Sequence, residues 1–474
     1  MKKPIPLIIG AYQAQSIIAS AQRCVNLYVE KNPPDSPFPT THYPTPGLRK
    51  LADGPGGGAQ GAFVASTDDL YFAAGGQLYR LNADFSYERL GNLASATRRM
   101  EMTDNGQHLV VVDGSPNGYT VDLKTREFAA MGGAGWYGSD RVDVMSGYLI
   151  FNRPETNQFY ASSPFGLQLD PLDFAGKVSS MDRLVACAVA NPNLWLFGER
   201  TSEIWRLSGA QDFAFAKFPG ANVQHGCAAP HSIAVIDSTV YWLAQNDQGG
   251  GIVMRTENVQ ATRASTHAIE QEIQTYPRID DAFGFAEQFN GHTFYVLNFP
   301  SADKTWAFDL ATKEWHERGF LDRRGALRQH RAGAVAYWKG RHIAFDRDTG
   351  DIYESRPDVY DDAGSPILRV RGFPHMVEGG NRVVYRQFIA DMAVGRTPAQ
   401  LVDEPRLRLR WSDTRGESWG NPIMLGLGRI GEFRRSLQFN RLGIARDRVF
   451  ELSWSAPVRT ALNGAFVDTE PAAS

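Results

Sequence analysis

The sequence repeats one unit, a short aromatic-rich β-hairpin, along most of its length. In each unit a short apolar run leads into a turn of residues such as glycine and aspartate, and a second strand follows. The first strands begin at residues 70, 109, 148, 194, 240, 294 and 342, so the steps are 39, 39, 46, 46, 54 and 48 residues. Because a single hairpin is marginal in water, these units must pack against one another.

Steps of this length in an all-β chain are the period of propeller blades. The sequence therefore predicts a β-propeller of seven blades, with six as the alternative, because the repeats share a pattern and not a tight consensus. An ordinary large β-sandwich is the competing fold, although its strands recur without a longer period. One segment, Ala264 to Tyr276, breaks the β pattern and predicts an amphipathic helix of three turns that connects two blades.

The composition divides the chain into three parts. Residues 1–60 are proline-rich and predict an extended N-terminal arm, residues 61–365 form the predicted propeller, and residues 366–474 predict an Arg-rich antiparallel β-sandwich. Residues 366–460 contain 16 Arg, no Lys and 9 acidic residues, a net charge of +7 in a chain whose total is −3. The rest of the chain is therefore acidic.

The arginine surplus has two readings. Guanidinium groups bind phosphates, but they are equally favoured in protein interfaces, where they pair with carboxylates and stack on aromatic rings. The alternation of Arg and Leu from Arg406 to Arg410 predicts a row of arginines on one exposed face of a strand. We favour a subunit or partner interface over direct DNA contact, and its candidate residues are Arg406, Arg408, Arg410, Arg434, Arg435, Arg446 and Arg448.

Two segments imitate ligand-binding motifs. Gly426 to Gly431 matches the dinucleotide fingerprint, but β-type sequence follows it where that site needs a helix, so a glycine-rich turn is favoured. Asp346 to Asp351 has carboxylates at calcium-loop spacing without the bidentate glutamate, so a solvated turn is favoured over a metal ion. Ser412 to Trp419 resembles the Asp-box hairpin, with Thr414 in place of its aspartate, and predicts a hairpin with a buried tryptophan.

Motifs for chemistry and for membranes are missing from the sequence. There is no zinc-protease histidine pair, no P-loop and no nucleophile elbow, so no catalytic, cofactor-binding or metal-binding residues are predicted. The three cysteines are widely spaced, as expected in a reducing cytoplasm. No apolar run approaches the ~20 residues of a membrane span. The short apolar run at the N-terminus is interrupted by Pro6, which disfavours a signal peptide.

Several segments taken together resemble the packaged-DNA stabilisation proteins of short-tailed bacteriophages. The resemblance extends over nearly the whole chain, although each motif alone is weak. The segments are Cys24 to Glu30, Thr45 to Leu48, Asn193 to Trp205, Ser265 to Glu270 and Arg441 to Arg448.

This resemblance implies a structural protein of the virion tail and not an enzyme. Such a protein forms the hub or nozzle, a homo-oligomeric ring of six below the portal and its adaptor, and is made and assembled in the host cytoplasm. The ring retains packaged DNA, docks the tail needle or plug and the tailspikes or fibres, and passes genomic DNA through its lumen without sequence specificity. Two alternatives stay open: a propeller glycosidase or lyase, with carboxylates and arginines in one pocket at the propeller axis, and a receptor-binding adhesin.

Overall fold

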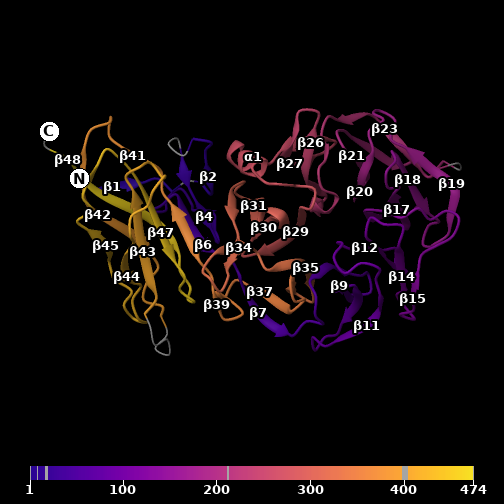
Figure 1. The fold of residues 1–474 in the computed structure, drawn as a ribbon, viewed down its shortest axis with the longest axis horizontal. Coiled ribbons are helices and arrows are strands. Elements are labelled where there is room, and N and C mark those ends of the chain that lie inside the picture. Colours follow the sequence, from indigo (N-terminus) through magenta and orange to yellow (C-terminus); the bar gives the residue numbers. More distant parts are fainter. Residues whose placement is uncertain (1, 8, 17–19, 211–212, 398–403, 473–474) are drawn as a thin grey trace.

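The computed structural model describes residues 2–7, 9–16, 20–210, 213–397 and 404–472. These residues form a ring of β-sheets joined at one side to a β-sandwich, and both chain termini lie at the sandwich end (Figure 1). The all-β class, the propeller and the C-terminal sandwich are confirmed. None of the helices in the described part is long and apolar enough to cross a bilayer.

Over the described ranges, seven sheets follow one another around the ring, and the innermost strand of each contacts that of the next. Each of the seven predicted hairpins lies in a different sheet of this ring. The first three sheets are β8 (Ala59–Val64), β9 (Leu70–Ala74), β10 (Gln77–Leu81) and β11 (Tyr87–Asn92); β12 (Glu101–Asp104), β13 (His108–Val112), β14 (Gly118–Asp122) and β15 (Phe128–Ala130); and β16 (Val142–Met145), β17 (Tyr148–Asn152), β18 (Gln158–Ser162) and β19 (Leu169–Gly176).

The remaining four sheets close the circle. They are β20 (Leu184–Ala190), β21 (Asn193–Gly198), β22 (Ser202–Leu207) and β23 (Phe215–Val223); β24 (Gly226–Cys227), β25 (Ala234–Ile236), β26 (Thr239–Asn246), β27 (Gly249–Glu257) and β28 (Gln260–Arg263); β29 (Phe283–Phe289), β30 (His292–Phe299), β31 (Lys304–Asp309) and β32 (Trp315–Glu317); and β35 (Ala332–Trp338), β36 (Arg341–Asp346), β37 (Ile352–Arg356) and β7 (Gly47–Ala52). A small hairpin, β33 (Gly319–Leu321) with β34 (Leu327–Gln329), lies between the last two.

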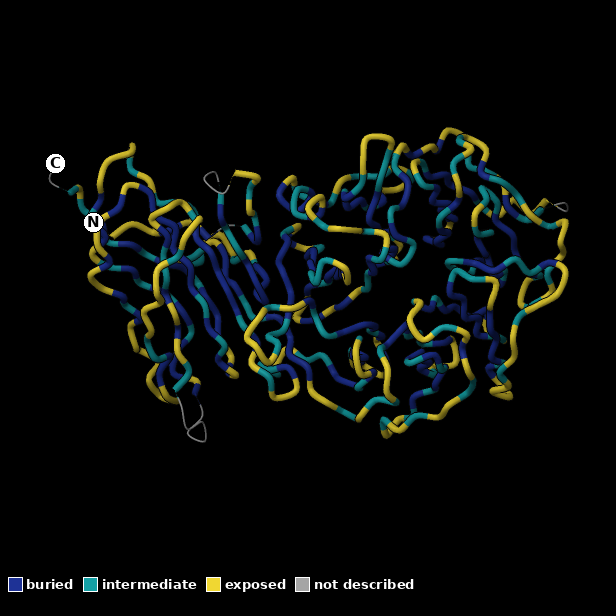
Figure 2. The backbone as a smooth tube through the Cα atoms, viewed as in Figure 1, coloured by how far each residue is buried: buried dark blue, intermediate teal, exposed yellow. Residues whose placement is uncertain are grey.

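The middle strands of the sheets are continuous apolar runs because both of their faces are buried. In β9, Leu70 and Phe72 pack toward β36 of the last sheet, whereas Tyr71 and Ala73 pack toward β13 of the next. Figure 2 shows these strands buried and the connecting loops exposed. The β9–β10 turn at Gly75 and Gly76 has positive φ at both residues, 57° and 77°, which a two-residue hairpin requires and glycine supplies without strain.

The sandwich is made from both ends of the chain. One sheet contains β45 (Leu437–Asn440), β42 (Val383–Met392), β48 (Leu462–Pro471), β6 (Thr40–Pro44) and β5 (Leu27–Lys31), with β1 (Lys2–Ile5) on β48 and β46 (Ile444–Ala445) on β42. The other contains β4 (Cys24–Val25), β40 (Arg369–Gly372), β47 (Asp447–Trp454), β43 (Arg406–Ser412) and β44 (Ile423–Gly426). Short pairs complete the fold: β2 (Tyr12–Gln13) with β3 (Ala21–Gln22), β38 (Asp361–Asp362) with β39 (Ser365–Pro366), and β41 (Met376–Val377) on β47.

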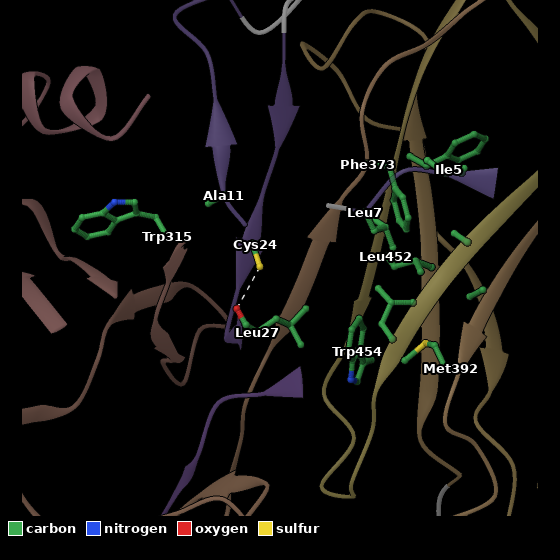
Figure 3. Close-up of a cluster of buried hydrophobic side chains, with 14 of the residues drawn as sticks. Ile5, Leu7, Ala11, Cys24, Leu27, Trp315, Phe373, Met392, Leu452 and Trp454 are labelled. Atoms are coloured by element: carbon green, nitrogen blue, oxygen red, sulfur yellow. Dashed lines mark hydrogen bonds between the residues drawn. The ribbon is translucent and has the colours of Figure 1, made fainter. Parts of the chain in front are cut away.

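The N-terminal segment, predicted as an extended arm, contributes strands to both the propeller and the sandwich. Strand β4 pairs in parallel with β32 of the propeller and antiparallel with β40 of the sandwich, and β7 completes the last propeller sheet beside β37. One apolar cluster runs from Trp315 in the propeller through Leu27 to Trp454 in the sandwich (Figure 3). The N-terminal strands therefore connect the propeller to the sandwich.

The predicted connecting helix is present but shorter than expected. Helix α1 (His267–Gln274) begins at Thr266, whose side chain accepts a hydrogen bond from the Ile269 N–H, and it lies between the fifth and sixth sheets. The N-terminal end of the predicted span is not helical, because the Ala264 N–H donates to the Val253 carbonyl of β27.

Candidate partner interface on the C-terminal sandwich

The predicted row of arginines lies on β43, beside the edge strand of its sheet. Leu407 and Leu409 are fully buried in the sandwich core, while Arg406 and Arg408 are exposed and Arg410 is half-buried. The alternation predicted from the sequence is therefore present in the structure. It arises because one face of β43 covers the core and the other faces solvent.

Edge strand β44 adds apolar surface next to these arginines. Met424 pairs with Arg408 across the two strands, so their side chains share a face, and Met424 is 43% exposed. In the described part of the sheet, β44 pairs with β43 alone and its other edge is open. An open edge with exposed apolar and arginine side chains is a surface suited to contact with another chain.

The loop between β44 and β45 carries a second group of exposed side chains. Ile430 and Phe433 are 67% and 63% exposed, and Arg434 beside them is exposed too. Arg435 is fixed by carboxylates of its own domain, since Nη1 lies 2.6 Å from Glu404 Oε1. We call Arg406, Arg408, Met424, Ile430, Phe433 and Arg434 the sandwich surface.

Two candidate arginines have local partners and remain partly accessible. The Arg410 Nε donates to Oε1 of buried Glu451 at 2.7 Å, and the guanidinium lies 4.7 Å from the centroid of the Trp419 ring. Arg446 is exposed and donates from Nη1 to the Gly380 carbonyl at 2.9 Å. Both side chains are therefore held in place by their own domain.

Arg448 does not belong to this surface, because it is only 1% exposed. Its guanidinium donates to both carboxylate oxygens of Asp413, at 2.6 and 2.8 Å, and to the Leu442 carbonyl. It also lies 4.5 Å from the centroid of the Tyr385 ring. Such a bidentate pair is among the stronger polar contacts. Here it stabilises the interior of the sandwich, and the Arg448 guanidinium is not accessible to a partner chain.

The remaining sequence motifs are turns. No helix follows the Gly426 to Gly431 segment, where Gly428 and Gly431 have positive φ of 84° and 96°. The Asp346 Oδ1 accepts hydrogen bonds from the backbone N–H groups of Asp348 and Thr349, so the turn itself uses it. Within the described residues no group of three or more His, Cys, Asp or Glu could hold a metal ion.

The Asp-box-like segment also forms a hairpin turn, which Ser412 Oγ stabilises by accepting from the Gly416 N–H at 2.8 Å. The prediction of a buried tryptophan was wrong. Trp419 is half-buried, because it lies at the surface against Arg410 and not in the core.

The propeller axis contains charged side chains that no sequence motif indicated. A cavity of about 510 Å³ is lined by arginines and carboxylates from several sheets. Most of these groups are paired: Arg278 Nε lies 2.6 Å from Asp280 Oδ1, and Arg183 forms an ion pair with Glu155. The carboxylates and arginines expected of a propeller enzyme do meet in this cavity. Glu155, Glu199 and Asp280 are paired with arginines, whereas Asp140 accepts from the Asn152 amide and Asp113 from Ser115.

Comparison with known proteins places both parts of the chain. The family model described as bacteriophage P22 Gp10, beta-propeller, matches residues 3–360, and the model described as bacteriophage P22 Gp10, beta-sandwich, matches residues 369–470. No curated protein sequence matches. A solved structure, the computationally designed Ika8 protein, aligns at a TM-score of 0.41 and 9% identity, covering 65% of this chain and 99% of that one. A likeness at that level has no bearing on function. The family matches cover nearly the whole chain, which therefore belongs to the phage packaged-DNA stabilisation family of bacteriophage P22 Gp10.

Proposed function

We propose that this chain is a non-enzymatic component of a virion tail that assembles into a ring-shaped hub, or nozzle, below the portal and its adaptor. The observation that carries the proposal is the match of both the propeller and the sandwich to one family of phage structural proteins. In this role the ring, expected to contain six copies and to form in the host cytoplasm, closes the vertex and retains the packaged DNA.

A ring of identical subunits needs heterologous contacts, in which two different surfaces of each copy complement each other. The sandwich surface supplies one candidate, because it combines exposed arginines with exposed apolar side chains beside an open sheet edge. The acidic remainder of the chain, −10 against +7 in residues 366–460, supplies charge of the opposite sign. Electrostatic complementarity of this kind favours correct pairing and fast association.

The other proposed partners are the portal or adaptor, the tail needle or plug, and tailspikes or fibres. Genomic DNA would pass through the ring lumen without sequence specificity. Contacts with moving DNA should be few, since each neutralised phosphate strengthens salt-dependent binding. Binding that is tight and sequence-specific would contradict this part of the proposal.

The test is the mass of the purified protein, alone and with its adaptor complex, measured by light scattering. We expect a ring of six, either alone or on the adaptor. The variant Arg406→Glu/Arg408→Glu/Arg434→Glu should weaken assembly at least ~10-fold, because like charges would face the acidic partner. The matched control is Arg323→Glu, an exposed arginine in the β33–β34 turn of the propeller. A wild-type protein that stays a monomer and binds no tail component would contradict the proposed function.

A further inference from the structure

A second cavity, of about 660 Å³, lies beside the first at the propeller axis. Its walls come from the start of β8, the β11–β12 connection, the short turn at Pro230–Ser232, β29, β34 and the turn after β36. These segments are spread over nearly 300 residues of sequence and belong to five of the sheets. They come together because the sheets form a closed ring around one axis. The volume lies within the range of small-molecule sites, roughly 300–1,000 Å³.

Arg99 presents a cation to this cavity without a carboxylate partner. Its guanidinium lies 3.7 Å from the centroid of the Phe283 ring, and Nη2 donates to the Gly333 carbonyl at 2.9 Å. Among the described residues, no ion pair within 4.0 Å involves Arg99. Burial lowers the pKa of Arg99 to about 10, so the side chain still carries its charge at neutral pH. The Arg99 side chain is half-buried and has no carboxylate partner in the described part of the chain, which makes it a candidate for an anionic ligand.

Two further groups that line the cavity have polar atoms without partners in the described part of the chain. Arg347 Nη1 has no acceptor for its hydrogen bonds, while Arg347 Nε donates to Asp348 Oδ2 at 3.4 Å. Gln329 is more than nine-tenths buried, and its Oε1 receives no hydrogen bond. Unsatisfied buried groups of this kind are rare in native proteins and call for a ligand, an ion or water.

His231 also lines the cavity, and a contact with Glu101 fixes the orientation of its ring. Its Nδ1 lies 2.9 Å from Glu101 Oε1, and the same carboxylate oxygen lies 3.5 Å from Arg141 Nη1. Burial alone would raise the pKa of Glu101, but Arg141 and His231 hold it to about 2. The Glu101 charge is therefore paired with these two side chains. Because a carboxylate can only accept, His231 donates to it from Nδ1, and in the neutral imidazole Nε2 is left as an acceptor for a ligand.

The opposite wall of the cavity carries two carboxylates, Asp281 and Asp348. Oδ2 of Asp281 accepts hydrogen bonds from the Ser301 backbone N–H at 2.9 Å and from Ser301 Oγ at 2.6 Å, whereas Oδ1 is buried without a partner among the described residues. Asp348 is largely exposed, and Arg347 is its neighbour. The cavity thus offers two guanidinium groups as donors, with Nε2 of His231, Oδ1 of Asp281 and the Gln329 amide oxygen as acceptors.

We propose that this axial cavity binds a small hydroxylated organic anion, with Arg99 and Arg347 holding its carboxylate or phosphate oxygens. The planar guanidinium matches both oxyanions bidentately. Hydroxyl groups of the ligand donate to Gln329 Oε1 and to Nε2 of His231. The site lies within one subunit and does not depend on the proposed ring.

Isothermal titration of the intact protein with citrate, inorganic phosphate and uncharged glucose, at constant ionic strength, tests this site. We expect saturable 1:1 binding of citrate or phosphate and none of glucose; the anion that binds more tightly identifies the oxyanion class. Arg99→Gln should weaken that binding at least ~10-fold, because it removes the unpaired cation. Arg323→Gln, at an exposed arginine that does not line the cavity, is the matched control and should bind as the wild type does.

The proposal is overturned if folded wild-type protein binds neither anion up to about 10 mM, or if folded Arg99→Gln binds as tightly as the wild type. Should Arg99→Gln fail to fold, as judged by circular dichroism, Arg347→Gln decides the matter. We expect at least a ~10-fold loss from that variant too, and unchanged affinity would overturn the site. None of these outcomes depends on ring assembly, which is measured separately by light scattering.

Discussion

The propeller and the sandwich are stabilised in different ways, although both are all-β. Most propeller sheets form from consecutive strands, and each buries its two faces against its neighbours. The sandwich instead combines strands from the two ends of the chain and buries arginines that donate to backbone carbonyls of distant segments. The propeller therefore depends on local sequence, whereas the sandwich depends on a few long-range contacts.

Arg371 is the clearest of those long-range contacts. It is fully buried on β40, and its guanidinium donates to the carbonyls of Ile9, Gly10 and Arg23 and to the Gln22 side chain. These four acceptors belong to the N-terminal segment, which the arginine ties to the sandwich. Without the guanidinium, the carbonyls of Ile9 and Gly10 would lose this donor, whereas the Arg23 carbonyl would keep the Gly372 N–H.

The largest expected effect therefore comes from Arg371→Met. We expect it to lower the free energy of unfolding by about 3–5 kcal/mol, measured by urea denaturation. Arg408→Met, an exposed arginine of the same domain, is the control and should stay within about 0.5 kcal/mol of the wild type. A loss below about 1 kcal/mol at Arg371 would show that the sandwich does not rely on this contact.

A smaller loss should follow from Leu48→Ala, which tests how the ring closes. Leu48 on β7 is buried against Ala332, Ala344 and Tyr353 of the last propeller sheet. Truncation should cost about 2–4 kcal/mol. The matched variant is Leu149→Ala, a fully buried leucine on β17 in a sheet made of consecutive strands. Similar losses at both sites would mean that β7 closes the ring as firmly as any other strand. A much smaller loss at Leu48 would contradict that closure.

The smallest effect concerns pH and the junction between the two parts. Asp362 is buried on β38; burial raises its pKa to about 7, and nearby Arg331 and Arg369 offset this only in part. The Asp362 carboxyl group therefore binds a proton more tightly in the folded state than in the unfolded chain. Its contribution to the free energy of unfolding falls as pH rises from about 4 to about 7. Asp362→Asn removes this titration and should stabilise the protein by about 1–3 kcal/mol at pH 8 but not at pH 4.

Thermal unfolding of the wild type and Asp362→Asn across pH 4 to 8 measures this difference. The pair at pH 4, where both side chains are neutral, serves as the internal control. If the difference in melting temperature between the two proteins is the same at every pH, the Asp362 carboxyl group does not titrate in the folded protein over this range.

The propeller could be predicted because its signal is local. Runs such as Leu109 to Val112, followed by a turn, form a hairpin with little reference to distant sequence. The N-terminal strands carry no such signal: β4 has two residues, and β6 reads Thr-Thr-His-Tyr-Pro. Strand β6 pairs with nearby β5, but the strands that join β4 and β6 to the rest of the fold, namely β32, β40 and β48, lie hundreds of residues away. Only the folded chain therefore identifies these segments as strands of the sandwich and not as an arm.

The candidate sites divide in the same way. The exposed row on β43 followed from alternation alone, because the pattern of one strand decides which side chains face the core. The burial of Arg448 could not be predicted, since Asp413, which holds its guanidinium, lies on another segment. The axial cavity was equally hidden, because Arg99, His231 and Arg347 meet only when the ring is closed.

The central claim is that this chain forms a tail hub whose subunits or partners meet at the sandwich surface. An electron cryo-microscopy map of the assembled tail tests it most directly. We expect a closed ring of six copies below the portal and adaptor, with Arg406, Arg408 and Arg434 against an acidic surface of another chain. A map in which the chain forms no ring, or in which these arginines all face solvent, would contradict the account.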